Sequence, residues 1–411
     1  MTYDGRGTGT MRIKQFLLAT FAVALLAVAQ ARADEARPFR EQESEGASLR
    51  YLDGIPVLTV EGTPEEIGRR HAELVKDVIP LLLDTPKRVL SGYGVNFDLV
   101  LPVASIAAKT MAARAPERYR RELEAAAKTA GVDANILYVA NCLVELRRMG
   151  GCSAFVVTPD QSETGAMIFG RNFDFPTFDV LDKYSCVTIF RPKGFHAFAS
   201  VTVPGFTGVL SGMNDAGLAI ATLDVYASGD GSPIYNVEGA PLAWTYRQIL
   251  EECATVDEAR ALLEKTSRTT YMNLVVCDRE QAVVFELTPK AVGVRRPEGA
   301  ILRCTNHFEL PEFQADIRCL RYFTLGKLME FKTGQKYSRE DVHRVMHSVN
   351  QGEMTFQTMI FEPASMKLHV AFGPGPISSA PLHELPLGRL LSPGANGDSA
   401  AKSAPGDAGK P

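Results

Sequence analysis

The stretch Gly150-Gly151-Cys152-Ser153-Ala154-Phe155 marks the point where the chain changes from one kind of secondary structure to another. Before it, apolar residues recur with the spacing of a helix. After it they alternate with a period of two, which is typical of strands. The sequence therefore predicts a helical N-terminal part and a strand-rich part that begins at Cys152.

Three segments before this stretch carry apolar residues at helical spacing. The spacing predicts helices over Ile67–Leu83, within Leu99–Ala130 and over Ile136–Arg148. Thr63 and Pro64 precede the first helix as an N-cap and a first-turn proline. After the stretch, the same spacing predicts three more helices: Leu242–Lys265, Ile317–Phe331 and Arg339–His347.

Short apolar segments separated by turn residues make up most of the remaining chain. The predicted strands are Ile55–Val60, Ala154–Val157, Ala166–Phe175, Cys186–Phe190, Ala197–Val203, Val209–Val225, Met272–Cys277, Val283–Leu287, Ile301–Thr305, Thr358–Phe361 and Lys367–Phe372. Short strands in hairpins beside a few long helices indicate an α+β fold in which helices cover antiparallel sheets.

The N-terminus has the three parts of a secretory signal peptide. Arg12 and Lys14 precede the apolar run Phe16–Ala29, and Ala31-Arg32-Ala33 supplies a cleavage site with small residues. The run is shorter than the about 20 apolar residues that span a bilayer. We therefore expect a protein that is secreted or periplasmic and has no stable membrane anchor.

These patterns divide the chain into four parts. Residues 1–33 form the signal peptide, whose first residue is Met1 or Met11. Residues 34–151 form the helical part, which begins with a loose polar leader over Asp34–Ser48. Residues 152–391 form the strand-rich core. Residues 392–411, which are rich in Ser, Gly, Ala and Pro, form a disordered tail.

Composition excludes several classes of protein. The chain is 45% hydrophobic and 22% charged with a formal net charge of −4, which excludes disordered, collagen-like and coiled-coil proteins. Lys+Arg number 44 against 48 Asp+Glu without a long basic run, so we expect no nucleic-acid partner. An odd number of cysteines leaves at least one thiol unpaired in an oxidising compartment. The seven are Cys142, Cys152, Cys186, Cys253, Cys277, Cys304 and Cys319.

Cys152 is the candidate nucleophile. Two glycines precede it, and glycine permits backbone conformations that other residues avoid. This freedom suits an attack of the thiol on the carbonyl of Gly151, an N-to-S acyl shift. Hydrolysis of the resulting ester would make Cys152 a new N-terminus, whose α-amine has a reference pKa of about 7.7–8.0 and suits a general base. A structural cysteine in a turn is the alternative on local sequence alone.

Further motifs follow in a fixed order. They are Gly170-Arg171-Asn172-Phe173-Asp174-Phe175, Gly212-Met213-Asn214-Asp215-Ala216-Gly217-Leu218, Thr305-Asn306-His307-Phe308 and Arg321-Tyr322. With Gly151-Cys152, this set resembles the penicillin acyltransferase-like family of N-terminal-nucleophile cysteine hydrolases, relatives of acid ceramidases and choloylglycine hydrolases. The likeness runs from about Gly54 to Leu387, and includes Gly62–Gly68 and Met359–Pro363.

The resemblance implies a four-layer αββα sandwich, the N-terminal-nucleophile hydrolase fold, and a role for each matching residue. Cys152 matches the nucleophile and Gly151-Cys152 the cleavage site. Arg171 matches a residue that holds the thiolate or the substrate carbonyl, and Asp174 the carboxylate that anchors the α-amine. Asn214 and Asn306 match side chains around the oxyanion. Arg321 matches a supporting arginine, with Arg318 one turn away as the alternative.

Several of these residues also have structural interpretations. A regular strand places Arg171 and Asp174 on opposite faces, so a shared site would need a bulge or turn between them. Asn214 suits a hairpin turn and Asn306 a loop turn.

Two histidine motifs offer alternatives. His343 and His347 share a helix face, but no HExxH glutamate accompanies them, so we expect no metal. His307 lies well downstream of Cys152 and would suit a papain-like pair that needs no chain cleavage.

We therefore expect an exported, self-processing amidohydrolase without a cofactor. Its substrate would be a small or lipid-like acylated amine, cleaved at the C–N bond through a thioester. The cleaved N-terminal chain would stay bound, because its amphipathic helices would otherwise expose their apolar faces. The alternatives are acyl transfer to an amine, the papain-like hydrolase, and a non-catalytic exported binding protein.

Overall fold

The computed structural model describes residues 37–92, 94–142, 145, 150–331 and 334–392. Contacts divide the chain into two units, 1–40 and 41–411, and every element below lies in the second. The predicted signal peptide and residues 393–411 of the predicted tail lie outside the described residues. Within the described part, none of the helices has the length and apolar character needed to span a bilayer.

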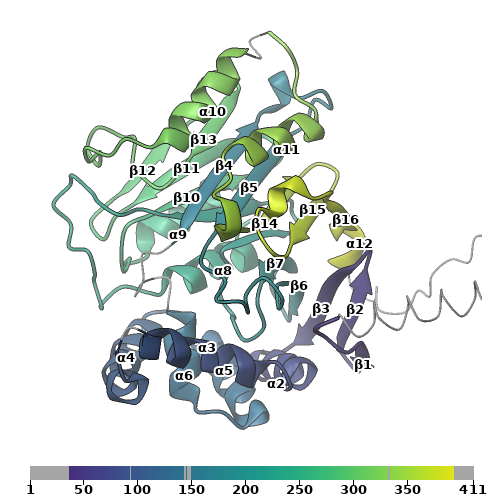
Figure 1. The fold of residues 1–411 in the computed structure, drawn as a ribbon, viewed down its shortest axis with the longest axis vertical. Coiled ribbons are helices and arrows are strands. Elements are labelled where there is room, and N and C mark those ends of the chain that lie inside the picture. The colour runs from purple at the N-terminus through teal and green to yellow at the C-terminus, as the bar shows by residue number, and fades with distance from the viewer. Residues whose placement is uncertain (1–36, 93, 143–144, 146–149, 332–333, 393–411) are drawn as a thin grey trace, which may run out of the picture. The chain divides into compact units, whose positions relative to one another are not determined.

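The described strands form two sheets (Figure 1). A ten-stranded sheet has the order β1-β2-β3-β6-β7-β8-β9-β10-β11-β12, and a six-stranded sheet has the order β13-β4-β5-β14-β15-β16. The strands are β1 Gln42–Ser44, β2 Ala47–Leu52, β3 Ile55–Gly62, β4 Gly151–Val157, β5 Ile168–Asp174, β6 Cys186–Pro192, β7 Phe198–Thr202, β8 Ser211–Asn214, β9 Ala219–Asp224, β10 Met272–Cys277, β11 Ala282–Leu287, β12 Val292–Arg295, β13 Ile301–Cys304, β14 Thr355–Glu362, β15 Lys367–Phe372 and β16 His383–Pro386.

One strand pair departs from the antiparallel pattern that the sequence predicts. β3 runs parallel to β6, whereas the other pairs described are antiparallel. Parallel neighbours need a long crossover connection. The N-terminal helices and strands β4 and β5 provide it.

Helices cover the outer face of each sheet. In the described part, α2, α8 and α9 contact the ten-stranded sheet, and α10 and α11 contact the six-stranded sheet (Figure 1). The helices are α2 Pro64–Val75, α3 Ile79–Gly92, α4 Phe97–Ala112, α5 Glu117–Ala130, α6 Ala134–Asn141, α8 Leu242–Glu252, α9 Val256–Lys265, α10 Leu320–Phe331, α11 Arg339–Ser348 and α12 Leu387–Leu390.

A buried apolar cluster fills the space between the two sheets. Ala154 and Phe169 come from the six-stranded sheet, and Ile189 and Val275 come from the ten-stranded sheet. Layers of helix, sheet, sheet and helix therefore follow one another. This confirms the predicted α+β class and the four-layer αββα sandwich.

Several predicted helices are interrupted. The helix predicted within Leu99–Ala130 is two helices, α4 and α5, because Pro116 becomes the N-cap of α5. Ile67–Leu83 divides into α2 and α3, and Leu242–Lys265 into α8 and α9, where the Thr255 side chain caps α9. Apolar periodicity persists across such short breaks, so the sequence pattern conceals them.

Other predicted boundaries also change. Residues 42–44 and 47–48 of the predicted leader lie in β1 and β2, where backbone pairing with the neighbouring strand orders polar residues. The strand segment predicted over Val209–Val225, in which Asn214 suits a hairpin turn, is the β8–β9 hairpin, with Gly217 in its turn at φ 88°. The predicted helix Ile136–Arg148 ends at Asn141, and its last residues lie largely outside the described part.

Buried ion pairs join the N-terminal helices to the core. Arg247 of α8 donates to both carboxylate oxygens of Glu122 in α5, at 2.7 and 2.6 Å, and to Glu251 at 2.8 Å. Arg118 of α5 also donates to Glu251, at 2.9 Å. Removing one partner of a buried ion pair typically costs about 3–5 kcal/mol, so this contact fixes α5 against the core.

Candidate active site

Cys152 is the second residue of β4, at the point where the N-terminal helical part gives way to the sheets. It pairs with Phe173 in β5, and its side chain is 2% exposed. Cys152 belongs to the apolar cluster between the two sheets. The thiol is therefore directed into the sandwich.

Arg171 is the charged partner of this thiol. Its Nη2 atom lies 3.6 Å from Cys152 Sγ and donates to the Thr222 carbonyl oxygen at 2.7 Å. Its Cζ atom lies 4.7 Å from the centre of the Phe173 ring. Nε and Nη1 are buried and have no hydrogen-bond partner in the described part of the chain. Arg171 therefore keeps donors for an oxygen atom that enters the site.

Two opposing effects set the pKa of the thiol. Burial raises the pKa of Cys152 to about 11, while the positive charge of Arg171 acts in the opposite direction. Since this structure has an intact Gly151–Cys152 peptide, the pKa belongs to the uncleaved chain. At neutral pH the thiol of that chain is predominantly protonated.

Asp174 ends β5, close to the backbone of Cys152. Its Oδ1 atom accepts from Thr355 Oγ1 at 2.6 Å and its Oδ2 atom accepts from Gln351 Nε2 at 2.9 Å. Arg321 Nη1 lies 3.5 Å from Oδ2. Burial raises the pKa of Asp174, although these hydrogen bonds and Arg321 favour the charged form.

Arg171 and Asp174 serve one site from opposite faces of β5. Alternation places Arg171 and Phe173 on the face toward the other sheet. It places Asn172, which donates to the Met346 carbonyl of α11, and Asp174 on the face toward the helices. A register shift does occur opposite this strand end, but it lies in β14. The expected bulge between the two residues is not needed, because one approaches the thiol of Cys152 and the other approaches its backbone.

Asn306 and Arg321 contact the backbone of Cys152. The Cys152 N–H donates to Asn306 Oδ1 at 2.7 Å. Arg321 donates from Nη1 to the Cys152 carbonyl oxygen at 2.5 Å and from Nη2 to Asn306 Oδ1 at 2.7 Å. Arg318, the alternative supporting arginine, is exposed. The structure thus brings Cys152, Arg171, Asp174, Asn306 and Arg321 together.

Asn214 is not brought to this group. Its Nδ2 atom donates to the carbonyl oxygens of Leu250 and Cys253, at 3.0 and 2.7 Å. Its Oδ1 atom accepts from the backbone N–H groups of Ala216 and Leu218, at 3.1 and 2.9 Å. Both donors and both acceptor positions of the amide are occupied. Asn214 therefore joins the β8–β9 turn to the end of α8 and has no donor left for an oxyanion.

His307 makes contacts that do not involve Cys152. Its Nε2 atom lies 2.5 Å from Glu309 Oε1, and its Nδ1 atom lies 3.0 Å from Thr305 Oγ1. Burial lowers the pKa of His307, but hydrogen bonds with Cys319 and Glu309 outweigh burial and raise it to about 9. Both ring nitrogens are thus occupied by residues other than Cys152, so these contacts do not support the papain-like pair.

The remaining sequence candidates are placed as follows. In the motif formed by His343 and His347, His347 Nδ1 contacts Ser378 Oγ at 3.0 Å. All seven cysteines lie in the described residues as free thiols. Six of them are buried, and Cys319 is partly exposed.

Sequence reasoning missed four polar residues around the nucleophile. Gln351 and Thr355 hold Asp174, Asp224 Oδ2 accepts from the Gly150 N–H at 3.2 Å, and the Tyr226 hydroxyl donates to the Gly150 carbonyl oxygen at 2.5 Å. Asp224 is the polar end of an otherwise apolar strand, which was the one available signal. Nothing in the local sequence distinguishes the other three.

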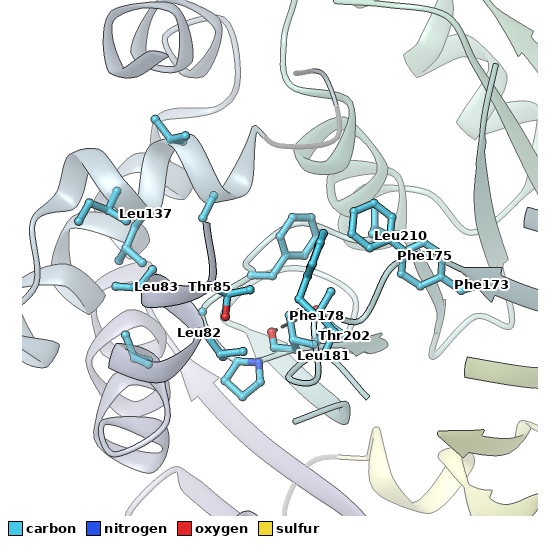
Figure 2. A pocket seen from close by; sticks show the side chains of 18 of the residues that line it. Leu82, Leu83, Thr85, Leu137, Phe173, Phe175, Phe178, Leu181, Thr202 and Leu210 are labelled. Atoms are coloured by element: carbon cyan, nitrogen blue, oxygen red, sulfur yellow. Dashed lines mark hydrogen bonds between the residues drawn. The ribbon is translucent and has the colours of Figure 1, made fainter. Parts of the chain in front are cut away.

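A cavity of about 460 Å³ opens beside Cys152. Ligand pockets typically have volumes of about 300–1,000 Å³. Phe173, Phe175 and Leu210 line it near β5, and Leu83 and Leu137 line it on the side of the N-terminal helices (Figure 2). Among the described lining residues, Asp224 carries the one formal charge. The cavity suits an apolar group that ends at the nucleophile.

Comparisons with known proteins relate the chain to a family of acyltransferases. The sequence profile of the family acyl-coenzyme A:6-aminopenicillanic acid acyl-transferase matches residues 161–375. An uncharacterized protein of Archaeoglobus fulgidus is 27% identical over 285 residues, and the match covers 62% of this chain and 47% of that protein. The chain thus spans about half the length of this curated relative.

Two solved structures illustrate the likeness. A Caenorhabditis elegans ortholog of N-acylethanolamine-hydrolyzing acid amidase has 19% identity and a TM-score of 0.43, covering 57% of this chain and 100% of that chain. Penicillin V acylase from Agrobacterium tumefaciens has 15% identity and a TM-score of 0.40, and the match covers 54% of this chain and 83% of that chain.

Proposed function

This chain belongs to the acyl-coenzyme A:6-aminopenicillanic acid acyl-transferase family, whose enzymes act on carbon–nitrogen bonds, and from this premise we propose a specific activity. The protein is an exported, self-processing N-terminal-cysteine amidohydrolase that cleaves an amide with a long apolar acyl group. One observation carries the proposal: the Cys152 thiol, beside the Arg171 guanidinium, lines the apolar cavity.

Self-cleavage is the first step. The Cys152 sulfur bonds to the carbonyl carbon of Gly151, the C–N bond of that peptide breaks, and the thiol proton passes to the departing nitrogen. Water then hydrolyses the thioester, which gives a Gly151 carboxylate, a free thiol and a free α-amine. The Asn306 amide oxygen accepts from this nitrogen already in the uncleaved chain, which supports its role in holding the α-amine.

Turnover repeats the same chemistry on an external amide. The α-amine takes the thiol proton as the sulfur attacks the substrate carbonyl, and the amine leaves from a thioester that water hydrolyses. The unpaired Nε–H and Nη1–H groups of Arg171 support a role in holding the substrate oxygen. Asp174 and Arg321 fix the backbone from which the amine projects.

The acyl group is assigned from the cavity. Its walls are mostly aliphatic and aromatic, and Figure 2 shows them extending from Phe173, the partner of Cys152 in β5, to Leu137 on the helices. Each buried methylene contributes about 0.8 kcal/mol. We therefore expect kcat/KM to rise roughly fourfold per methylene until the chain fills the cavity.

The cleaved N-terminal chain remains part of the enzyme. Leu83 and Leu137, which line the cavity, precede the cleavage site, whereas Phe173 follows it. The buried pair of Arg247 and Glu122 also links the two sides of the cleavage site. Loss of the smaller chain would open the cavity and leave Arg247 buried with fewer partners.

Intact-mass measurement of the purified protein tests this proposal. We expect two chains, Asp34–Gly151 and Cys152–Pro411, that separate only on denaturation and hydrolyse N-acyl amides. Cys152→Ala should give one inactive chain, with Cys142→Ala as a control that still cleaves. An active wild-type protein that stays uncut would contradict self-cleavage, and equal rates on acetyl and long-chain amides would contradict the acyl assignment.

Acyl transfer to an amine is the second candidate, because the family is described as acyltransferases. Both outcomes share one thioester and differ in what attacks it. Hydroxylamine offered with the substrate distinguishes them. Hydroxamate formed in large excess over free acid at low acceptor concentration would favour transfer.

A further inference from the structure

Three side chains hold three consecutive peptide groups at the cleavage site. The Tyr226 hydroxyl donates to the Gly150 carbonyl, which belongs to the peptide before the scissile one. Asn306 accepts from the Cys152 N–H of the scissile peptide itself. Arg321 donates to the Cys152 carbonyl, which belongs to the peptide after it. The scissile bond is thus fixed from both sides.

Gly150, the residue before the scissile peptide, is hydrogen-bonded at both its N–H group and its carbonyl oxygen. Asp224 Oδ2 accepts from the Gly150 N–H at 3.2 Å, while Tyr226 Oη lies 2.5 Å from the Gly150 oxygen. Glycine loses more conformational freedom than any other residue when it is fixed, so two successive glycines would otherwise sample many carbonyl orientations. Together with Asn306 Nδ2, which donates to the same Gly150 oxygen at the longer distance of 3.5 Å, these two contacts select one orientation.

We infer that Tyr226 is a positioning residue for self-cleavage and has no part in turnover by the mature enzyme. The inference rests on the proposed self-cleavage. An attacking atom gains rate when it is held at about 3–3.5 Å from its target in the correct orientation. By fixing the peptide of Gly150, Tyr226 restricts the adjacent Gly151 carbonyl, which the Cys152 sulfur attacks.

Tyr226 is placed where it can act on the uncleaved chain alone. Its side chain is 42% exposed, and it is not among the residues that line the cavity, unlike Asp224. Once the peptide bond is cut, Gly150 belongs to the other chain and no longer adjoins a reacting carbonyl. The hydrogen bond then orients nothing that takes part in hydrolysis of an external amide.

Time-resolved processing of the full chain tests this inference. The chain is synthesised in a cell-free system, and the appearance of Cys152 as a new N-terminus is followed by intact mass. Tyr226→Phe removes the hydroxyl and keeps the ring. Tyr235→Phe is the matched control, because Tyr235 is similarly exposed at 46%. We expect Tyr226→Phe to cleave about fivefold to tenfold more slowly, as for the loss of one oriented hydrogen bond, and the control to cleave at the wild-type rate.

The fully processed enzymes are then compared by kcat and KM on one amide substrate. We expect wild-type values for Tyr226→Phe, since its defect precedes maturation. Wild-type cleavage rate in Tyr226→Phe would overturn the inference, and so would a kcat that falls in proportion to the cleavage rate. A wild-type chain that never cleaves would instead reject the self-cleavage on which the inference rests.

Discussion

Gln351 Nε2 lies 1.6 Å from the position that a Cβ atom on Gly151 would occupy. Gly151 is also the first residue of β4 and has an extended backbone. A side chain at position 151 would therefore have to displace the Gln351 amide, whereas the extended backbone there imposes no need for glycine. The same Gln351 nitrogen donates to Asp174, so the size of residue 151 is coupled to the carboxylate of the site.

We predict that Gly151→Ala prevents self-cleavage by displacing Gln351 and, through it, Asp174. Intact mass should show one chain, and the melting temperature should fall because backbone or side chain must move to remove the overlap. Gly165→Ala is not a suitable control because Gly165 has a φ of 66°. Gln351→Ala is the informative companion variant, because it removes the amide that obstructs a Cβ atom at position 151. Adding Gln351→Ala to Gly151→Ala should recover much of the lost stability, and strictly additive losses would contradict this steric account.

We predict that Arg171→Lys raises the pKa of the Cys152 thiol and reduces kcat/KM at least about tenfold. Lysine keeps a positive charge but cannot place separate nitrogens on the Thr222 carbonyl and on the thiol. Since Arg171 acts against the effect of burial, its weakening favours the protonated thiol. The pH midpoint for alkylation of Cys152 should move upward. Arg318→Lys, at an exposed position, should leave it unchanged.

We predict that Asn214→Ala lowers stability alone, whereas Asn306→Ala prevents self-cleavage. Asn214→Ala removes four hydrogen bonds to backbone groups, so stability should fall by about 2–4 kcal/mol in urea unfolding. The fraction that folds should cleave itself and turn over normally. Asn306→Ala also removes hydrogen bonds, to Asp224 and Arg321, so its stability should fall as well, but its folded fraction should lose self-cleavage because the scissile nitrogen loses its acceptor. Loss of catalysis in a well-folded Asn214→Ala protein would contradict this prediction and indicate that Asn214 acts in the active site.

We predict that Leu83→Trp shifts acyl preference toward shorter chains. Leu83 lines the cavity on the helix side, across from Phe173 (Figure 2). A larger side chain there shortens the space while leaving the nucleophile untouched. kcat/KM should fall about tenfold or more for long acyl amides and change little for short ones. Leu81→Trp is the control, because Leu81 is 49% exposed and outside the lining. A uniform loss over all chain lengths would contradict the assignment.

The amino-acid pattern alone predicts the fold class and the strand that carries Cys152. Period-two alternation after Gly150-Gly151 reflects faces buried between layers, and burial is what imposes that pattern. The sequence also predicts Arg171, Asp174, Asn306 and Arg321 as site residues, because their order matches a family. The profile match over residues 161–375 confirms that family.

The packing of distant segments establishes which of these residues meet and what surrounds them. Asn214 matched a family motif, yet its amide is fully used by the end of α8, which its own turn cannot reveal. Gln351 and Tyr226 carry no local signal, because they reach Asp174 and Gly150 across long separations in the chain. Apolar periodicity indicates which faces of helices and strands are buried, and a motif indicates which residue types follow one another in the chain. A hydrogen bond between residues far apart in sequence exists only once packing has fixed both partners, and for that reason the structure alone identified these contacts.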